Sequence, residues 1–196
     1  MSRRSIIRVA LFAGSLFVSA GVDAAVFSAD AVKAAFLFRF ASFVEWPPDV
    51  PAAGPFVIGV AEGDAVADQL ERLLPGMNVR GQPCQVRRLS KPEELDGVHI
   101  LYVGQGAAVR SRALRARAIT LPILLVTERD DGFEGGGVIN FIEAPRNVRF
   151  EVSLIAADRA RLTIDSALLA VAARVERRVQ VGARCESCGR YAEVAP

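Results

Sequence analysis

The chain is poor in the residues that most active sites need. It has one histidine, His99, and only three cysteines among 196 residues. A zinc site needs several such ligands close together, so the composition argues against a metal centre. No G-x-S-x-G segment is present, which removes one common setting of a serine nucleophile. We therefore expect no enzyme, no cofactor and no metal, and we expect His99 to be a structural residue inside an apolar strand.

A surplus of positive charge is also missing from the part of the chain that would remain after export. The full sequence holds 24 basic and 22 acidic residues. Removal of residues 1–24, interpreted below as a signal peptide, takes away three arginines and one aspartate and leaves 21 of each. A nucleic-acid-binding domain would show a basic excess, so the charge argues against that class.

The N-terminal segment is typical of a cleavable signal peptide. Three arginines within residues 3–8 precede an uncharged apolar stretch at 9–22, which glycines and serines interrupt. The stretch is shorter than the roughly 20 apolar residues of a transmembrane helix, and residues 22–24 are a small-residue pattern suited to signal peptidase. We expect a periplasmic protein with a signal peptide at 1–24. An uncleaved anchor or a buried N-terminal helix is the alternative.

Short apolar runs alternate with amphipathic segments along the mature chain. The continuous apolar runs predict buried strands at 55–61, 98–103 and 123–127, with a further extended segment at 79–89 that turns at Gly81. Helical spacing of apolar residues predicts helices at 30–46, 64–74 and 107–118. The first of these has Asp30 as its expected N-cap and Pro47 as its stop. This alternation is typical of a mostly parallel sheet covered on both faces.

The pattern changes in the C-terminal third. Segments 137–143 and 147–154 alternate apolar and polar residues around a short turn, which predicts an antiparallel β-hairpin. Helices are expected at 156–161 and, capped by Asp165 or Thr163, at 165–178. The predicted fold is a single α/β domain over residues 25–178, with a mixed, mostly parallel sheet flanked by helices on both faces and a C-terminal hairpin followed by helices. Residues 179–196 are expected to form a tail.

Two glycine segments admit a functional and a structural interpretation. Gly104 and Gly106 follow a predicted strand, as in a dinucleotide fingerprint, but Val109 stands where the third glycine belongs. Glu128, after the next strand, stands near the expected position of a ribose-binding acid. The glycine run 135–137 could cradle an anion or form a mobile loop before the hairpin. We favour a tight turn for the first segment and a loop for the second.

The tail contains the segment Cys185-x-x-Cys188, which could be a redox pair, half of a zinc site or a structural disulfide. Thioredoxin-like chemistry places such a pair at a helix N-terminus after a strand, whereas this one follows a predicted helix. No second cysteine or histidine pair completes a zinc site. We favour a disulfide between Cys185 and Cys188, or an ordinary tail. The odd count leaves one thiol over or paired between chains.

Four stretches, in order along the chain, resemble the YfiR/HmsC-like family of periplasmic regulators. They are VKAAFLFRFASFVEWP at 32–47, VHILYV at 98–103, GGVINF through VRFEVSL at 136–154 and AADRARLTIDSALL at 156–169. Arg39 stands where the family pattern usually has asparagine, and Val98 stands where it has a cysteine.

The resemblance implies a non-enzymatic periplasmic repressor. Such a protein binds the periplasmic sensory part of an inner-membrane diguanylate cyclase, lowers cyclic di-GMP and restrains biofilm formation. It also implies an outer-membrane lipoprotein that sequesters the repressor, a homodimer and cysteine-dependent stability. It implies no catalytic residue.

Aromatic side chains dominate many protein interfaces, so Phe36, Phe38 and Trp46 are the predicted partner-binding residues. Their alternative role is in the core. A second hypothesis is a periplasmic small-ligand binding or sensing protein that uses the loops after Ala61 and Val103, because ligands in open α/β sheets bind at the carboxyl ends of strands. A third is a thiol-redox or nucleotide-dependent enzyme.

Overall fold

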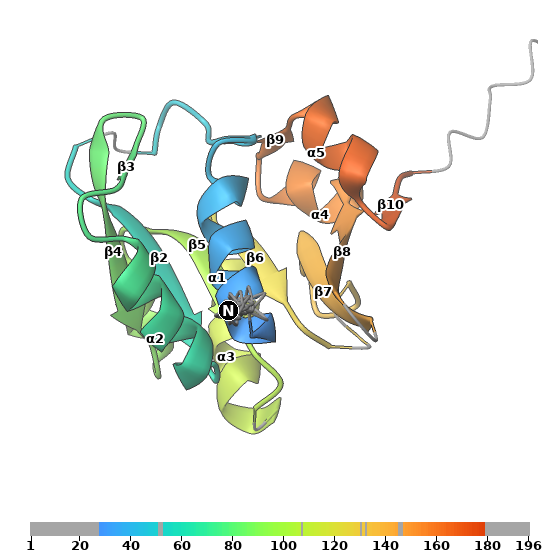
Figure 1. Cartoon of the computed structure of the whole chain (residues 1–196). Coiled ribbons are helices and arrows are strands. Elements are labelled where there is room, and N and C mark those ends of the chain that lie inside the picture. Colours follow the sequence, from blue (N-terminus) through green and yellow to red (C-terminus); the bar gives the residue numbers. More distant parts are fainter. Residues whose placement is uncertain are drawn as a thin grey trace, which may run out of the picture.

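The computed structural model describes residues 28–50, 53–106, 108–129, 131, 133–144 and 147–178. The predicted signal peptide and the Cys185/Cys188 pair lie outside these residues. Within them, one sheet of eight strands crosses the molecule in the order β10-β8-β7-β6-β5-β2-β4-β3 (Figure 1). The strands are β2 (Phe56–Ala61), β3 (Asn78–Val79), β4 (Gln82–Arg88), β5 (Val98–Val103), β6 (Leu124–Thr127), β7 (Ile139–Ala144), β8 (Asn147–Ser153) and β10 (Arg174–Glu176).

Five of the seven strand pairings in this sheet are parallel. The central strands β4, β2, β5, β6 and β7 run in one direction, and β10 runs parallel to β8. The antiparallel pairings are the β7–β8 hairpin and the short β3–β4 hairpin, whose turn residues Arg80 and Gly81 both have positive φ. The predicted hairpin and the predicted turn at Gly81 are thus confirmed.

Helices cover both faces of the sheet, and the core is divided between the two faces. Helices α1 (Ala29–Phe40) and α2 (Asp64–Leu73) lie in front of the sheet in Figure 1. They pack on side chains such as Ile58, Ile100 and Leu124. Helix α3 (Ala108–Ala118) and a 3-10 helix, η1 (Pro92–Leu95), pack on the opposite face. Burial on both faces explains the uninterrupted apolar runs of β2, β5 and β6, and the predicted fold class is confirmed.

The predicted start and end of the first helix were wrong. Helix α1 is capped by Ser28, whose extended backbone lets its Oγ accept a hydrogen bond from the Ala31 amide, while Asp30 lies in the first turn. The helix ends at Phe40 instead of Trp46. Strand β1 (Val44–Glu45) follows and pairs with β9 (Thr163–Ile164), so a pairing distant in sequence overrides the helical spacing of the aromatic residues.

The long helix predicted at 165–178 was also wrong. After α4 (Leu154–Arg159) comes α5 (Ser166–Val171), which is capped by Asp165 as predicted. Ala172 then takes an extended conformation, and β10 adds to the edge of β8. Arg174 pairs with Glu151, and Glu176 accepts a hydrogen bond from Ser153, so polar contacts to β8 hold the segment as a strand.

Candidate partner-binding surface

Helix α1 presents two different sides to its surroundings. Leu37 and Phe40 are fully buried against the sheet. Val32, Phe36 and Arg39 lie one turn apart beside this buried stripe. The helix therefore carries a core stripe and, next to it, a stripe of half-buried and exposed residues.

A groove of about 560 Å³ lies between α1 and α2. Its floor is apolar, and its lining residues from the two helices are Ala31, Val32, Ala34, Ala35, Phe36, Arg39, Gln69, Arg72 and Leu73. No carboxylate lines it, and neither Arg39 nor Arg72 makes an ion pair with a described residue. The groove thus joins an apolar floor to two free positive charges.

Phe36 is shared between the groove and the core. Its ring is half-buried and lies 5.8 Å from the ring of Phe40, 6.2 Å from Phe141 and 5.5 Å from Phe150. Stacked and edge-on aromatic pairs at such distances stabilise a core beyond the area they bury. Phe36 is therefore fixed in place and offers one side of its ring to the groove.

The other two predicted anchors are also half-buried, but they lie in different surroundings. Phe38 packs at the margin of the core cluster that contains α1. Trp46 lies 5.3 Å from Phe56 and 6.2 Å from His99, and the guanidinium of Arg80 lies 5.6 Å from its ring centre. The ring contacts of Trp46 and of Phe36 have no residue in common, so these anchors do not form one aromatic cluster.

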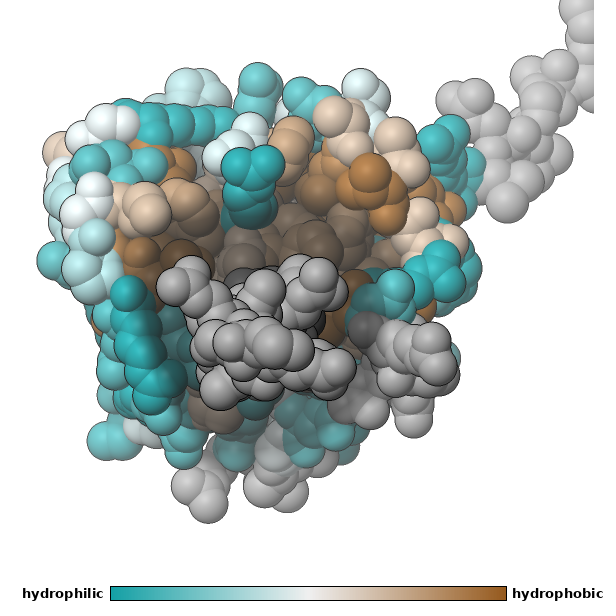
Figure 2. Space-filling view, in the orientation of Figure 1, coloured by the Kyte–Doolittle hydropathy of each residue, from teal (hydrophilic) through white to brown (hydrophobic). Residues whose placement is uncertain are grey.

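The hydrophobic surface continues beyond α1. Figure 2 shows apolar residues gathered over the part of α1 that the grey atoms leave in view and over α5. Leu169 of α5 is half-buried and packs on the core, and Val171, at its end, is 69% exposed. Exposed apolar side chains on one face are the usual sign of a protein contact.

A buried ion pair fastens α1 to the sheet. Lys33 Nζ lies 2.5 Å from Glu128 Oε1, and the hydroxyl of Tyr102 donates to Glu128 Oε2 at 2.6 Å. All three residues are less than 8% exposed, and burial together with the Glu128 carboxylate raises the pKa of Tyr102. Glu128 is thus fully engaged by its neighbours, which removes its candidate role as a ribose-binding acid.

The sequence interpretation missed Lys33, although a signal was present. Lys33 precedes Leu37 by four residues and Phe40 by seven, so it belongs to the buried stripe of the helix. A lysine in such a stripe needs a buried acid as partner. Glu128, at the end of a buried strand, was the available one.

His99 is the structural residue that the sequence predicted. It is 7% exposed, its ring stacks on Phe56 at 4.5 Å, and its Nδ1 accepts a hydrogen bond from the Val57 amide at 3.2 Å. The β2–β5 register shifts at this point, and the imidazole satisfies the amide that the irregular ladder leaves open. Burial lowers the pKa of His99, in accord with a neutral, accepting imidazole.

The two glycines after β5 serve close packing. A Cβ at Gly104 would collide with the carbonyl oxygen of Glu62, and a Cβ at Gly106 would collide with the Glu62 carboxylate. The loop after β2 therefore passes directly over this turn. This contact supports the tight-turn interpretation over a phosphate-binding one.

Polar residues near the carboxyl end of β6 have hydrogen-bond or ion-pair partners among themselves. A cavity of about 460 Å³ there is lined by Gln105, Glu128, Arg129, Asn140, Phe141, Ile142, Glu151 and Arg174. Arg129 pairs with Asp131, Arg174 pairs with Glu151, and Asn140 Oδ1 accepts from Thr127 and from the Arg129 amide. The second hypothesis, ligand binding at these strand ends, thus finds groups that already have partners.

Other candidate sites gain no support from the described residues. In these segments no group of three or more metal-ligating side chains comes together, and no helix is long and apolar enough to cross a bilayer. Cys84 is free and half-buried on β4, and burial raises the pKa of its thiol. A thiol held in its protonated form is a poor nucleophile.

A model of the YfiR/HmsC-like family matches residues 30–173. The chain belongs to this family. The YfiR/HmsC-like family is one of periplasmic, non-catalytic regulators of diguanylate cyclase signalling. The matched residues include α1 with its groove, the buried ion pair and the β7–β8 hairpin.

Among solved structures, the chain is similar to a conserved domain protein from Vibrio cholerae O1 biovar El Tor, with 16% identity and a TM-score of 0.48. It is also similar to the ABC domain of Streptococcus pneumoniae in complex with L-Trp, with 14% identity and a TM-score of 0.48. Each likeness covers 74% of this YfiR/HmsC-like chain and 60% of the other, so the chain spans about three fifths of each relative's length. No curated protein matches the chain.

Proposed function

We propose that the protein represses an inner-membrane diguanylate cyclase by binding the periplasmic sensory part of that enzyme. The observation that carries the proposal is the α1–α2 groove, which combines an apolar floor with Arg39 and Arg72, neither of which pairs with an acid among the described residues. A matching segment of the cyclase would carry apolar side chains flanked by carboxylates. Repression keeps cyclic di-GMP low and restrains biofilm formation.

Binding represses only if it distinguishes two states of the target. The regulator must bind the inactive conformation of the sensory part more tightly than the active one, since equal affinity would shift no population. A rigid groove suits this task. Phe36 is held by three aromatic neighbours and α1 by the Lys33–Glu128 pair, so the binding surface is formed in advance.

Release and assembly complete the proposal. An outer-membrane lipoprotein would free the cyclase by sequestering the regulator, and the regulator would act as a homodimer. Export by a signal peptide at residues 1–24 would deliver it to the outward-facing side of the target. Phe38 and Trp46, half-buried near other apolar residues, remain candidates for these contacts.

The test is repression by groove variants in a strain that lacks the native gene and retains the cyclase. Deletion should raise cyclic di-GMP, and the wild-type gene should lower it again. Ala35→Glu places a carboxylate in the groove at an exposed helical position, where the substitution costs little stability. We expect this variant to leave cyclic di-GMP at the level of the deletion strain.

Ala65→Glu is the matched control. It makes the same substitution at an exposed position of α2 that does not line the groove, and it should repress as the wild type does. Periplasmic amounts and thermal unfolding of both variants verify that they fold. Full repression by Ala35→Glu would refute the role of the groove, and an unchanged cyclic di-GMP level in the deletion strain would refute repression itself.

A further inference from the structure

Among the residues that the structure describes, Arg115 is a buried cation with two nitrogens that have no hydrogen-bond acceptor. Arg115 of α3 is 7% exposed, and its Nε and Nη1 are buried without a partner among the described residues. A charged donor removed from water and left unpaired is costly, so a residue of this kind is found where something else supplies the acceptor.

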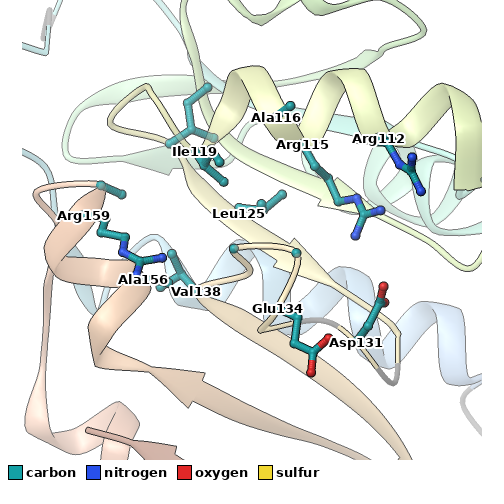
Figure 3. Close-up of a pocket in the computed structure, with 14 residues that line it drawn as sticks. Arg112, Arg115, Ala116, Ile119, Leu125, Asp131, Glu134, Val138, Ala156 and Arg159 are labelled. Atoms are coloured by element: carbon teal, nitrogen blue, oxygen red, sulfur yellow. The ribbon is translucent and has the colours of Figure 1, made fainter. Parts of the chain in front are cut away.

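Arg115 is one of the residues that line a cavity. The cavity measures about 460 Å³ and lies between α3, the loop at 131–138 and α4, as Figure 3 shows. This volume is within the range of about 300–1,000 Å³ that small-molecule sites occupy. The cavity is separate from the α1–α2 groove, with which it shares no lining residue.

Positive charge exceeds negative charge around this cavity. Arg112 and Arg159 also line it, and neither makes an ion pair with a residue that the structure describes. Of the two lining carboxylates, Asp131 pairs with Arg129 at 2.7 Å and lies near enough to Arg115 for that charge to help lower its pKa, and Glu134 is the other, so two carboxylates face three guanidinium groups. The surplus favours an anionic ligand.

The glycines Gly135 and Gly136 let the loop that forms one wall of the cavity pack closely against α3. A Cβ at Gly135 would collide with Arg115 Nη1, and one at Gly136 would collide with the side chain of Ile119. Gly136 also has a φ of +81°, which favours glycine. These glycines therefore let the loop approach Arg115 more closely than residues with side chains could.

The remaining walls are apolar. Ile119 and Leu125 line one part, and Val138 and Ala156 line another (Figure 3). A ligand that filled the cavity would contact these four side chains with its uncharged portion, because none of them carries a charge.

We propose that this cavity binds a small organic anion, whose carboxylate or phosphate accepts hydrogen bonds from Arg115 and whose apolar body lies against Leu125 and Val138. The site adds ligand recognition to a regulator whose partner surface lies elsewhere. It does not depend on the proposed repression, because binding can be measured with the purified protein alone.

The experiment is calorimetric titration of the purified mature protein with four probes: 3-phenylpropanoate, phenyl phosphate, the neutral 3-phenylpropanamide and inorganic phosphate. At least one of the two aromatic anions should bind, and which of them binds more tightly identifies the anionic group. The amide should bind at least about tenfold more weakly than its acid, because it lacks the charge-assisted hydrogen bonds. The Nε–Hε signal of Arg115 in an NMR spectrum should shift on titration.

Arg115→Met keeps the length of the side chain and removes the donors. It should weaken binding of the preferred anion at least about tenfold. Arg117→Met, at an exposed position of the same helix outside the cavity, should bind as the wild type does. Unchanged affinity in Arg115→Met, or no binding of either aromatic anion to the wild type, would overturn the proposal. Inorganic phosphate binding as tightly as phenyl phosphate would also overturn it, since the apolar walls would then contribute nothing.

Discussion

His99 and Lys33 are both buried polar residues. The contact that each of them makes requires a neutral side chain for His99 and a charged one for Lys33. The imidazole of His99 accepts from a backbone amide and so must be neutral. Lys33 is paired with Glu128 and so must be charged. A pH change across the neutral range therefore acts on His99, whose ordinary pKa of 6.5 lies within that range.

We predict that the protein loses stability as the pH falls from about 7 to 5. Burial lowers the pKa of folded His99, only partly offset by a hydrogen bond with the backbone of Gly97. Between this lowered pKa and 6.5 the unfolded chain binds more protons than the folded one. The free energy of unfolding then decreases with decreasing pH. Urea unfolding at a series of pH values measures this slope.

His99→Asn isolates the effect, because the chain has no other histidine. The variant should be less stable at neutral pH but should show a shallower slope in this window. The lowered pKa values of Asp49 and Asp131 act at lower pH, because their stabilising effect is lost only as the pH falls below their ordinary value of 3.8. An equal slope in the variant and the wild type would show that His99 is not the titrating group.

At the scale of single elements, the start of α1 offers a direct comparison of two caps. Ser28 Oγ accepts a hydrogen bond from the Ala31 amide at 3.2 Å. Asp30 instead forms an ion pair one turn along the helix, with 3.9 Å between its Oδ1 and Lys33 Nζ. Ser28→Ala should lower the free energy of unfolding by about 1 kcal/mol, the usual value of an N-cap. Asp30→Ala should cost about half as much, from the helix dipole and a partly exposed ion pair. Equilibrium urea unfolding checks both, and a larger loss in Asp30→Ala would favour the cap that the sequence predicts.

The sequence predicts an element well when a local pattern of apolar residues shows that the element is buried. Strands β2, β5 and β6 are buried on both faces, so their apolar runs identified them. The errors fall where two conformations suit the same residues. Phe43 and Val44 continue the helical spacing of α1, yet Val44 pairs with Ile164 across the chain. Ala172 and Val175 likewise continue the spacing of α5, and only the free edge of β8 makes that segment a strand.

The candidate sites show the same limit. Of the predicted anchors Phe36, Phe38 and Trp46, only Phe36 lines the groove, whose second wall on α2 depends on how the helices pack. Arg115 was missed, although it lies in a buried stripe with Ser111, Leu114 and Ala118 at helical spacing. The spacing shows that Arg115 is buried. Only the folded chain shows that a cavity lies beside it.

At the scale of the whole molecule, the described strands other than β1 and β9 form one continuous sheet. The sheet runs from β3 to β10 without a break, and both faces share its strands. Such an arrangement favours unfolding as a single cooperative unit.

We predict that two probes of unfolding give the same urea midpoint. The single tryptophan, Trp46, lies against Phe56 and His99 at the start of β2 and β5, so its fluorescence reports on that region. Far-UV circular dichroism reports on all helices and strands. Coincident transitions are the expected result, whereas separate midpoints would divide the chain into independently folding parts.

The Lys33–Glu128 pair also has a consequence for how the chain can vary over generations. Loss of either charge alone leaves the other one buried without its partner, which costs about 3–5 kcal/mol and is comparable with the whole stability of many domains. Replacement of both by apolar residues leaves no unpaired charge, although it removes the acceptor of the buried Tyr102 hydroxyl. We therefore expect the two positions, which lie 95 residues apart, to covary among related sequences.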